Sequence, residues 1–212
     1  PGPQACPFAP KFRHAKARRR GGGLRFDFAT LTGQPARVDV FQASRGRKVF
    51  RARRVARFAG RTAAFSWNGR SRRRLTNGFY FARFMTGNAE DHDIRRVTLV
   101  RRNGRFRVVR PHYRRSTCGV LRSFKLSSPA FGGSNRKRLG IAYRLGGEAR
   151  VGVVVRRGKK VVRRFRTRTR AASVIHRLSV RPRGLRRGVY RVTVTVAAEG
   201  RTTRSTLYSR RL

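Results

Sequence analysis

A short motif that occurs twice constrains the fold of this chain more than any other feature. It reads LTNGFY around Gly78 and Tyr80, and LRRGVY around Gly188 and Tyr190, about 110 positions later. Glycine permits a tight corner that a residue with a Cβ atom would strain. The tyrosine then enters alternating apolar residues, and a phenol at the corner of a β-sandwich can hydrogen-bond to upstream backbone. The repeat therefore predicts two copies of one β module.

Alternating apolar residues accompany both copies of the motif in the same order. Residues 24–28 (LRFDF) correspond to residues 139–143 (LGIAY), and residues 36–40 (ARVDV) correspond to residues 149–153 (ARVGV). A period of two marks a half-buried strand, and the Asn-Gly pair at 103–104 is a strong hairpin signal. No stretch has the pattern of a convincing amphipathic helix. The expected fold class is all-β, with short antiparallel strands packed as a sandwich.

The repeat also predicts where the chain divides. Residues 22–112 are expected to form the first sandwich, and residues 129–212 the second. Residues 1–21 are rich in Pro, Ala and Arg and show no period, so they predict a basic lead-in segment. Residues 113–128 are predicted to be a linker, in which residues 121–126 could form an edge strand.

The first copy carries a further element before its corner. Residues 65–70 read FSWNGR, and a few polar residues later the chain reaches Gly78 and Tyr80. This arrangement resembles the Trp-(Asp/Asn)-Gly … Gly-x-Tyr pattern of bacterial Ig-like domains, and it is similar to the Ig-like domain of flagellar hook-capping proteins. The match covers residues 46–86. Such modules are also widespread at the C-termini of secreted bacterial enzymes and surface proteins.

The resemblance implies two tandem Ig-like or fibronectin III-like antiparallel β-sandwiches. The second copy lacks the Trp-Asn-Gly element, because residues 178–181 read LSVR there, and it resembles only the generic corner. A non-catalytic accessory or scaffolding module is implied, without a flagellar role. Five residues are expected to be structural parts of the corners: Trp67, Gly78, Tyr80, Gly188 and Tyr190.

The charge of the chain points to polyanionic partners. There are 56 Lys and Arg residues against 7 Asp and Glu residues, a net charge of +49. Such a field attracts nucleic acid, anionic cell-wall polymers or other polyanions. A GC-rich genome would explain Arg in place of Lys, but not the shortage of acids. Selection for a polyanion and genomic bias both stay open.

Two groups of arginines are candidate polyanion-binding sites. Along residues 164–170, alternate positions would place four guanidiniums on one face of a strand, about 6.8 Å apart, and guanidiniums bind phosphate or carboxylate in a bidentate manner. Charge that protects an edge strand from aggregation is the alternative. The hairpin near 103–104 carries a similar patch. The candidates are Arg164, Arg166, Arg168, Arg170, Arg95, Arg101, Arg102 and Arg105.

The sequence offers no catalytic site. No Gly-x-Ser-x-Gly elbow is present, and none of the histidines has zinc-ligand spacing. The acidic run at 90–93 could hold Ca²⁺ but lacks the Asp-x-Asp-x-Asp-Gly spacing. Asp27 and Asp39 lie within predicted strands, where pairing with arginine across the sheet is expected. We therefore expect no enzymatic activity, no metal and no cofactor.

The two cysteines bear on the compartment. Cys6 and Cys118, the latter in the predicted linker, lie on either side of the first module. Such a pair predicts a disulfide bond and an oxidising, extracellular or cell-envelope environment; two unrelated thiols are the alternative. No apolar stretch is long enough to span a membrane. Because the chain begins at Pro1, an upstream domain of the same polypeptide is an expected partner.

The function expected from the sequence is that of a non-catalytic extracellular or cell-envelope module pair. It would serve as an adhesive, structural or accessory region of a larger secreted bacterial protein. One alternative is a protein that binds nucleic acid or an anionic cell-wall glycan through arginine-rich strand faces. Another is a carbohydrate-binding appendage of a secreted hydrolase, which would need Trp67 as an exposed platform and not as part of the core.

Overall fold

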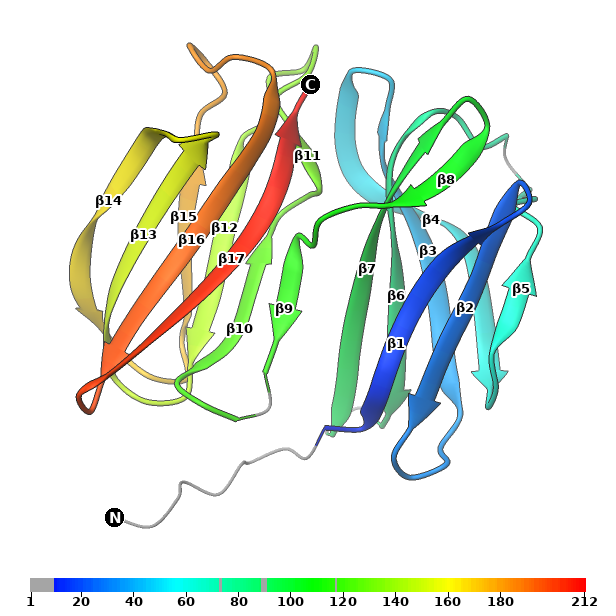
Figure 1. The fold of residues 1–212 in the computed structure, drawn as a ribbon, viewed down its shortest axis with the longest axis horizontal. Helices are drawn as coiled ribbons and strands as arrows, with labels where there is room; N and C mark the ends of the chain where they lie inside the picture. Colours follow the sequence, from blue (N-terminus) through cyan, green and yellow to red (C-terminus); the bar gives the residue numbers. More distant parts are fainter. Residues whose placement is uncertain (1–9, 73, 89–90, 117) are drawn as a thin grey trace. The chain divides into compact units, whose positions relative to one another are not determined.

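The computed structural model describes residues 10–72, 74–88, 91–116 and 118–212, and the chain divides into two units (Figure 1). We call Pro10–Pro111 the first unit and the residues from His112 to Leu212 the second unit. Every regular element among the described residues is a β-strand. The all-β fold class predicted from the alternation is therefore confirmed.

The first unit consists of two antiparallel sheets. One has the strand order β1-β2-β5 and the other the order β4-β3-β6-β7-β8. Side chains from both sheets, including Phe26 on β2, Trp67 on β5 and Phe84 on β6, share one buried cluster. This arrangement fits a β-sandwich. The strands are β1 (Phe12–Arg20), β2 (Gly23–Thr30), β3 (Ala36–Arg45), β4 (Lys48–Arg61), β5 (Phe65–Trp67), β6 (Gly78–Gly87), β7 (His92–Arg102) and β8 (Arg105–Val108).

The second unit also fits a β-sandwich. Its sheets have the orders β15-β12-β10-β9 and β11-β17-β16-β13-β14, and only the short β11 runs parallel to its neighbour β17. Both sheets contribute to a second buried cluster. The strands are β9 (Tyr113–Arg115), β10 (Leu121–Leu126), β11 (Ala130–Phe131), β12 (Leu139–Leu145), β13 (Ala149–Arg157), β14 (Lys160–Arg170), β15 (Ile175–Val180), β16 (Gly188–Ala198) and β17 (Arg201–Arg211).

The alternation of apolar residues explains why these segments are strands. On β16, Tyr190, Val192 and Val194 are buried in the core, while the intervening Arg191 and Thr193 point away from it. Burying a Val, Ile or Leu side chain contributes roughly 1.5–3 kcal/mol. A one-residue slip would move the whole apolar set to the solvent face, so the pattern also determines the register.

The predicted lead-in segment is wrong from Phe12 onward, because Phe12–Arg20 form β1 of the first unit. The strand pairs with β2, but its register shifts between Phe12 and His14. Only Phe12 and Ala17 of this strand are buried. The shift and the run of exposed arginines hide the period of two, which is why the sequence did not reveal the strand. Residues 1–9 lie outside the described residues.

The predicted linker at residues 113–128 is also wrong. Tyr113–Arg115 form β9, and Leu121–Leu126 form β10, which pairs with both β9 and β12. Phe124 and Leu126 are buried in the core of the second unit. The sequence allowed an edge strand at 121–126, but β10 has neighbours on both sides and contributes to the core.

Each unit has a tyrosine corner of the kind that the repeated motif predicts. The Tyr80 hydroxyl donates to the Thr76 carbonyl oxygen at 2.6 Å and accepts from the Thr76 amide at 3.2 Å. The Tyr190 hydroxyl donates to the Arg186 carbonyl oxygen at 2.7 Å. Both rings are fully buried. The phenol therefore fixes the connection that enters β6 in the first unit and β16 in the second.

Gly78 is required at the first corner. Its φ of +154° lies in a region that favours glycine, and a Cβ atom there would meet the Ser44 carbonyl oxygen at 2.1 Å. The Ser44 hydroxyl in turn accepts the Phe79 amide at 2.8 Å. This close approach joins β3 to the start of β6 and positions the connection described next.

Candidate anion-binding cleft

The connection between β5 and β6 is held by side chains that bond to its backbone. The Trp67 indole Nε1–H donates to the Arg70 carbonyl oxygen at 2.7 Å, and Asn68 Oδ1 accepts the Arg70 amide at 2.9 Å. The Ser71 hydroxyl donates to the Val55 carbonyl oxygen on β4 at 2.7 Å. The connection is therefore fixed at several points, and the guanidinium of Arg70 extends from an anchored backbone.

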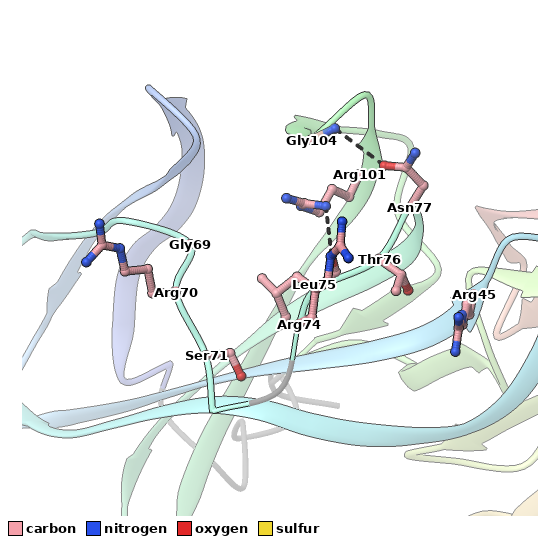
Figure 2. A pocket seen from close by; sticks show the side chains of 10 residues that line it. All are labelled: Arg45, Gly69, Arg70, Ser71, Arg74, Leu75, Thr76, Asn77, Arg101 and Gly104. Carbon is pink, nitrogen blue, oxygen red and sulfur yellow. Dashed lines mark hydrogen bonds between the residues drawn. The ribbon is translucent and has the colours of Figure 1, made fainter.

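A cleft of roughly 700 Å³ lies between this connection, the β3–β4 turn and the β7–β8 turn. Figure 2 shows the lining side chains on these separate stretches of backbone. Polar groups of Ser71, Thr76 and Asn77 lie among them, and no carboxylate does. The positively charged lining residues are Arg45, Arg70, Arg74 and Arg101.

Arg101 is the anchored cation of this cleft. Its Nη1 donates to the Leu75 carbonyl oxygen at 3.0 Å, and its guanidinium carbon lies 5.8 Å from the centre of the Phe106 ring (Figure 2). The side chains of Arg45, Arg70 and Arg74 are exposed and have no hydrogen-bond or ion-pair partner among the described residues. Four guanidiniums and no acid make the cleft suited to an oxyanion, which guanidinium binds in a bidentate manner.

The aspartates of the first unit pair with basic side chains or backbone amides of neighbouring elements. Asp39 on β3 is fully buried, and its carboxylate lies 2.9 Å from Arg57 Nε on β4, 2.7 Å from Arg83 Nη2 on β6 and 3.4 Å from Arg37 Nε. Burial raises the pKa of Asp39, but hydrogen bonds from Arg83 and Arg57 outweigh that effect and leave the pKa below its ordinary value. The predicted cross-strand pairing of Asp39 is confirmed.

Asp27 is paired in the same way. Hydrogen bonds from His14 at 3.1 Å and from Arg18 at 2.8 Å, both on β1, lower the pKa of the Asp27 carboxyl. Asp93, at the start of β7, is buried and accepts the amides of Lys11 and Phe12 at 3.2 and 3.3 Å. These carboxylates hold neighbouring strands together.

The predicted single face of four arginines on β14 is wrong. Arg168 and Arg170 lie opposite Val151 and Ala149, whose side chains face the core, whereas Arg164 lies opposite Val154 on the other face. The register of β14 against β13 shifts between Val151 and Val153, and Arg166 falls within this bulge. A bulge inserts an extra residue, so strict alternation does not continue through it. The strand is at the edge of its sheet, as the alternative interpretation supposed.

The predicted hairpin arginines do not form one patch either. Arg95 pairs with Asp93 at 3.0 Å, and Arg101 belongs to the cleft. Arg102 and Arg105 are exposed and lie opposite each other where β7 turns into β8. Of the eight arginines proposed from the sequence, the structure brings only Arg101 into the cleft.

Sequence reasoning missed Arg45, Arg70 and Arg74. Arg45 ends β3, and Arg70 and Arg74 lie on the β5–β6 connection. These two segments meet Arg101 only when β3, β6 and β7 pair and the tyrosine corner closes. The run of arginines at 72–74 indicates a high local charge. It does not indicate on which face the side chains lie or which other side chains are near them. Of this run, residue 73 lies outside the described residues.

The remaining site predictions concern cysteines, metal and membrane. Cys6 lies outside the described residues, so its bond to Cys118 stays a prediction. Glu90 also lies outside them, while Asp91 pairs with Lys11 Nζ at 2.7 Å. The described residues contain no cluster of three or more His, Cys, Asp or Glu side chains suited to a metal ion. They also contain no helix of the length and apolarity needed to cross a membrane.

No protein-family model matches the chain, and no curated protein matches it. What the cleft binds is therefore inferred from its own geometry and charge.

Proposed function

We propose that the chain is a non-catalytic pair of Ig-like modules that binds an anionic cell-wall polymer, as an accessory region of a larger secreted or cell-envelope protein of a bacterium. The ligand in this proposal is a polymer that carries phosphate or carboxylate groups at regular intervals. The proposal has two parts, the Ig-like character of the modules and the nature of their ligand.

The strand order supports the Ig-like part. In the first unit, β1, β2 and β5 form one sheet, and β3, β4, β6 and β7 lie in the other. This corresponds to strands A, B and E facing strands C, C′, F and G in Ig nomenclature, with the tyrosine corner at the start of strand F. The second unit has the same arrangement with β10, β12 and β15 facing β13, β14, β16 and β17.

One observation carries the ligand part: the 7 acidic residues of the chain are far too few to pair with its 56 Lys and Arg residues. Glu148 and Glu199 are the only acidic side chains in residues 112–212, and neither forms an ion pair with a described residue. In the first unit, Asp39 alone contacts three arginines. Guanidiniums left without carboxylates attract external anions and exchange their counterions for them.

The first unit and the second unit carry positive charge but no exposed aromatic side chains, among the described residues, on which bases could stack. This combination favours an anionic wall polymer over nucleic acid as the ligand. Base readout requires an element that enters a groove, and binding of single strands uses exposed aromatic side chains for stacking. The exposed large apolar side chains among the described residues are all aliphatic, for example Leu31, Val174 and Val189. Trp67 is only 6% exposed, so it does not provide the platform that the carbohydrate-binding alternative needs.

The test is a binding panel at about 0.15 M ionic strength, where only close contacts escape screening. The intact chain is titrated with inorganic polyphosphate, polygalacturonate, double-stranded DNA and neutral dextran, and binding is followed by fluorescence anisotropy of a labelled polymer. We expect binding to polyphosphate and polygalacturonate and none to dextran. Binding to DNA alone would replace the proposal with the nucleic-acid alternative, and binding to none of the polymers would overturn it.

A further inference from the structure

The second unit has a cationic cleft of its own beside its tyrosine corner. It measures roughly 560 Å³ and lies between the connection from β15 to β16, the loop from β11 to β12 and the end of β17. No carboxylate lines it. The guanidiniums at this cleft belong to Arg136, Arg138, Arg181, Arg183 and Arg211.

One arginine holds the same place in both clefts. Arg101 on β7 lies directly opposite Gly78 on β6, and Arg211 on β17 lies directly opposite Gly188 on β16. Gly78 and Gly188 are the glycines of the repeated corner motif. In each unit, therefore, the arginine projects from the strand that pairs with the tyrosine-bearing strand, at the level of the corner.

Both arginines are anchored by the backbone of the corner connection. Arg101 Nη1 donates to the Leu75 carbonyl oxygen at 3.0 Å, and Arg211 Nε donates to the Pro182 carbonyl oxygen at 3.2 Å. Both side chains are half-buried. A guanidinium has five N–H donors, and the other four of each arginine have no hydrogen-bond partner among the described residues. In Arg101 the Nε–H is buried, so the donors open to a ligand are those of its two terminal nitrogens. Each cleft thus contains a fixed cation with donors to spare.

The anchored arginine is accompanied by exposed cations whose side chains have no partner in the part of the chain that the structure describes. In the first cleft these are Arg45, Arg70 and Arg74. In the second cleft they are Arg136, Arg138, Arg181 and Arg183. Arg181 and Arg183 lie on the connection that enters the tyrosine-bearing strand, as Arg70 and Arg74 do in the first unit, whereas Arg136 and Arg138 lie on the β11–β12 loop. The shared elements are therefore the anchored arginine, the corner, the cations on the connection that enters it and the surplus of charge, while the other cations differ.

From this equivalence we propose that each module has one anion subsite at its tyrosine corner, built around Arg101 in the first unit and Arg211 in the second. Each subsite takes a single phosphate or carboxylate group of the polymer. The inference rests on the proposed function and specifies where on the surface that function is carried out. Half-burial of the anchored guanidinium makes its contact with an oxyanion stronger than one made by a fully hydrated side chain.

The test compares variants that remove equal charge at different places, with labelled polyphosphate as the probe. The cleft variant removes three side chains that have no partner among the described residues, so folding should be unaffected: Arg45→Gln, Arg70→Gln and Arg74→Gln. The matched control removes three exposed, equally unpartnered arginines elsewhere in the first unit: Arg13→Gln, Arg51→Gln and Arg107→Gln.

We expect the cleft variant to lose at least about tenfold more affinity than the control, and its salt slope to fall by about one per arginine removed. The second cleft is tested in the same way. The cleft variant there is Arg138→Gln, Arg181→Gln and Arg183→Gln, and its control is Arg150→Gln, Arg166→Gln and Arg204→Gln.

Two failures can be told apart. If the cleft and control variants lose equal affinity for polyphosphate, the subsites are overturned. The proposed function still stands in that case, provided that the wild-type chain binds polyphosphate. A wild-type chain that does not bind polyphosphate would remove the basis of both proposals. Thermal unfolding of every variant shows whether a loss of binding reflects a loss of fold. If only one of the two cleft variants loses the expected affinity, the subsite is restricted to that module.

Discussion

Arg83 on β6 donates a hydrogen bond of 2.7 Å from Nη2 to Oδ2 of Asp39, a fully buried carboxylate on β3 in the larger sheet of the first unit. Arg57 approaches the other carboxylate oxygen from β4 at 2.9 Å. One acid therefore ties together three neighbouring strands in a chain with very few acids. Removing it leaves several guanidiniums facing one another without a counter-charge.

We predict that Asp39→Asn lowers the free energy of unfolding by about 2–3 kcal/mol. A fully buried pair that loses one partner costs about 3–5 kcal/mol, but the side chains of Arg37, Arg57 and Arg83 are 37%, 43% and 24% exposed and can be partly hydrated. Urea denaturation measures the difference. Asp27→Asn, which removes a partly exposed pair, is the control and should cost less.

The same carboxylate makes stability depend on pH. The folded pKa of Asp39 is lowered below its ordinary value of 3.8. Its contribution is therefore present above pH 3.8 and is lost as the pH falls through the folded pKa, because the unfolded chain then binds the proton first. Unfolding measured at a series of pH values below 5 should show a steeper loss in wild type than in Asp39→Asn. Parallel curves would contradict this assignment.

The tyrosine corners can be tested with single hydroxyl deletions. Tyr80→Phe should cost about 1–3 kcal/mol, because the Thr76 carbonyl and amide both lose a partner in a partly buried place. Tyr190→Phe loses one bond, to Arg186, and should cost less. Denaturant unfolding ranks the two variants, and the reverse order would count against the stated bonds.

Alkaline titration gives an independent check on the corners. Burial raises the pKa of Tyr80, against the lowering effect of its bond to Thr76, and burial likewise raises the pKa of Tyr190. A raised folded pKa means that the stabilisation is complete below pH 10.0 and is lost as the pH rises further, since the unfolded phenol ionises first. The phenylalanine variants should lose stability less steeply above pH 10.0.

Trp67 is expected to act through the core and not through a ligand. Trp67→Ala should lower the stability of the first unit by about 3–5 kcal/mol, since it removes a large buried ring packed against Phe58 and Phe106. Trp67→Phe keeps much of the volume and should cost less. Circular dichroism with denaturant measures both. If the wild-type chain binds glycans and Trp67→Ala loses that binding while its stability is unchanged, the core assignment is contradicted.

The cysteine pair supplies the test of the extracellular proposal. We predict that Cys6 and Cys118 are joined in the native protein, which would stabilise it by up to about 4–5 kcal/mol through loop-closure entropy. Intact mass measured without reductant, before and after alkylation, distinguishes a disulfide from two thiols. Two free thiols in protein isolated from its native source would argue against secretion.

The strands with clear alternation could be predicted from the sequence because a period of two is a direct consequence of one buried face. Residues 24–28 and 139–143 are such cases, and they lie in β2 and β12. The corner could be predicted for a similar reason: glycine and tyrosine at fixed spacing satisfy a local backbone geometry. Both inferences depend on residues that are close in the sequence.

The features that escaped prediction depend on register and on distant segments. The shift in β1 between Phe12 and His14, and the bulge in β14 opposite Gly152, leave no mark in composition. The first cleft collects Arg45 from the end of β3 and Arg101 from β7, two strands that are distant in the sequence and lie on either side of β6 in the sheet. Counting arginines along the chain therefore found the charge but not the place where it converges.

The salt dependence of polyphosphate binding tests the central claim most directly, because counterion release distinguishes ionic contacts from all others. The affinity of the intact chain is measured by anisotropy over a series of NaCl concentrations. We predict a linear fall of log K with log[NaCl], with a slope steeper than about −3, which corresponds to several phosphate groups bound at once. A slope between zero and about −1 would contradict the claim that unpaired guanidiniums bind the polymer.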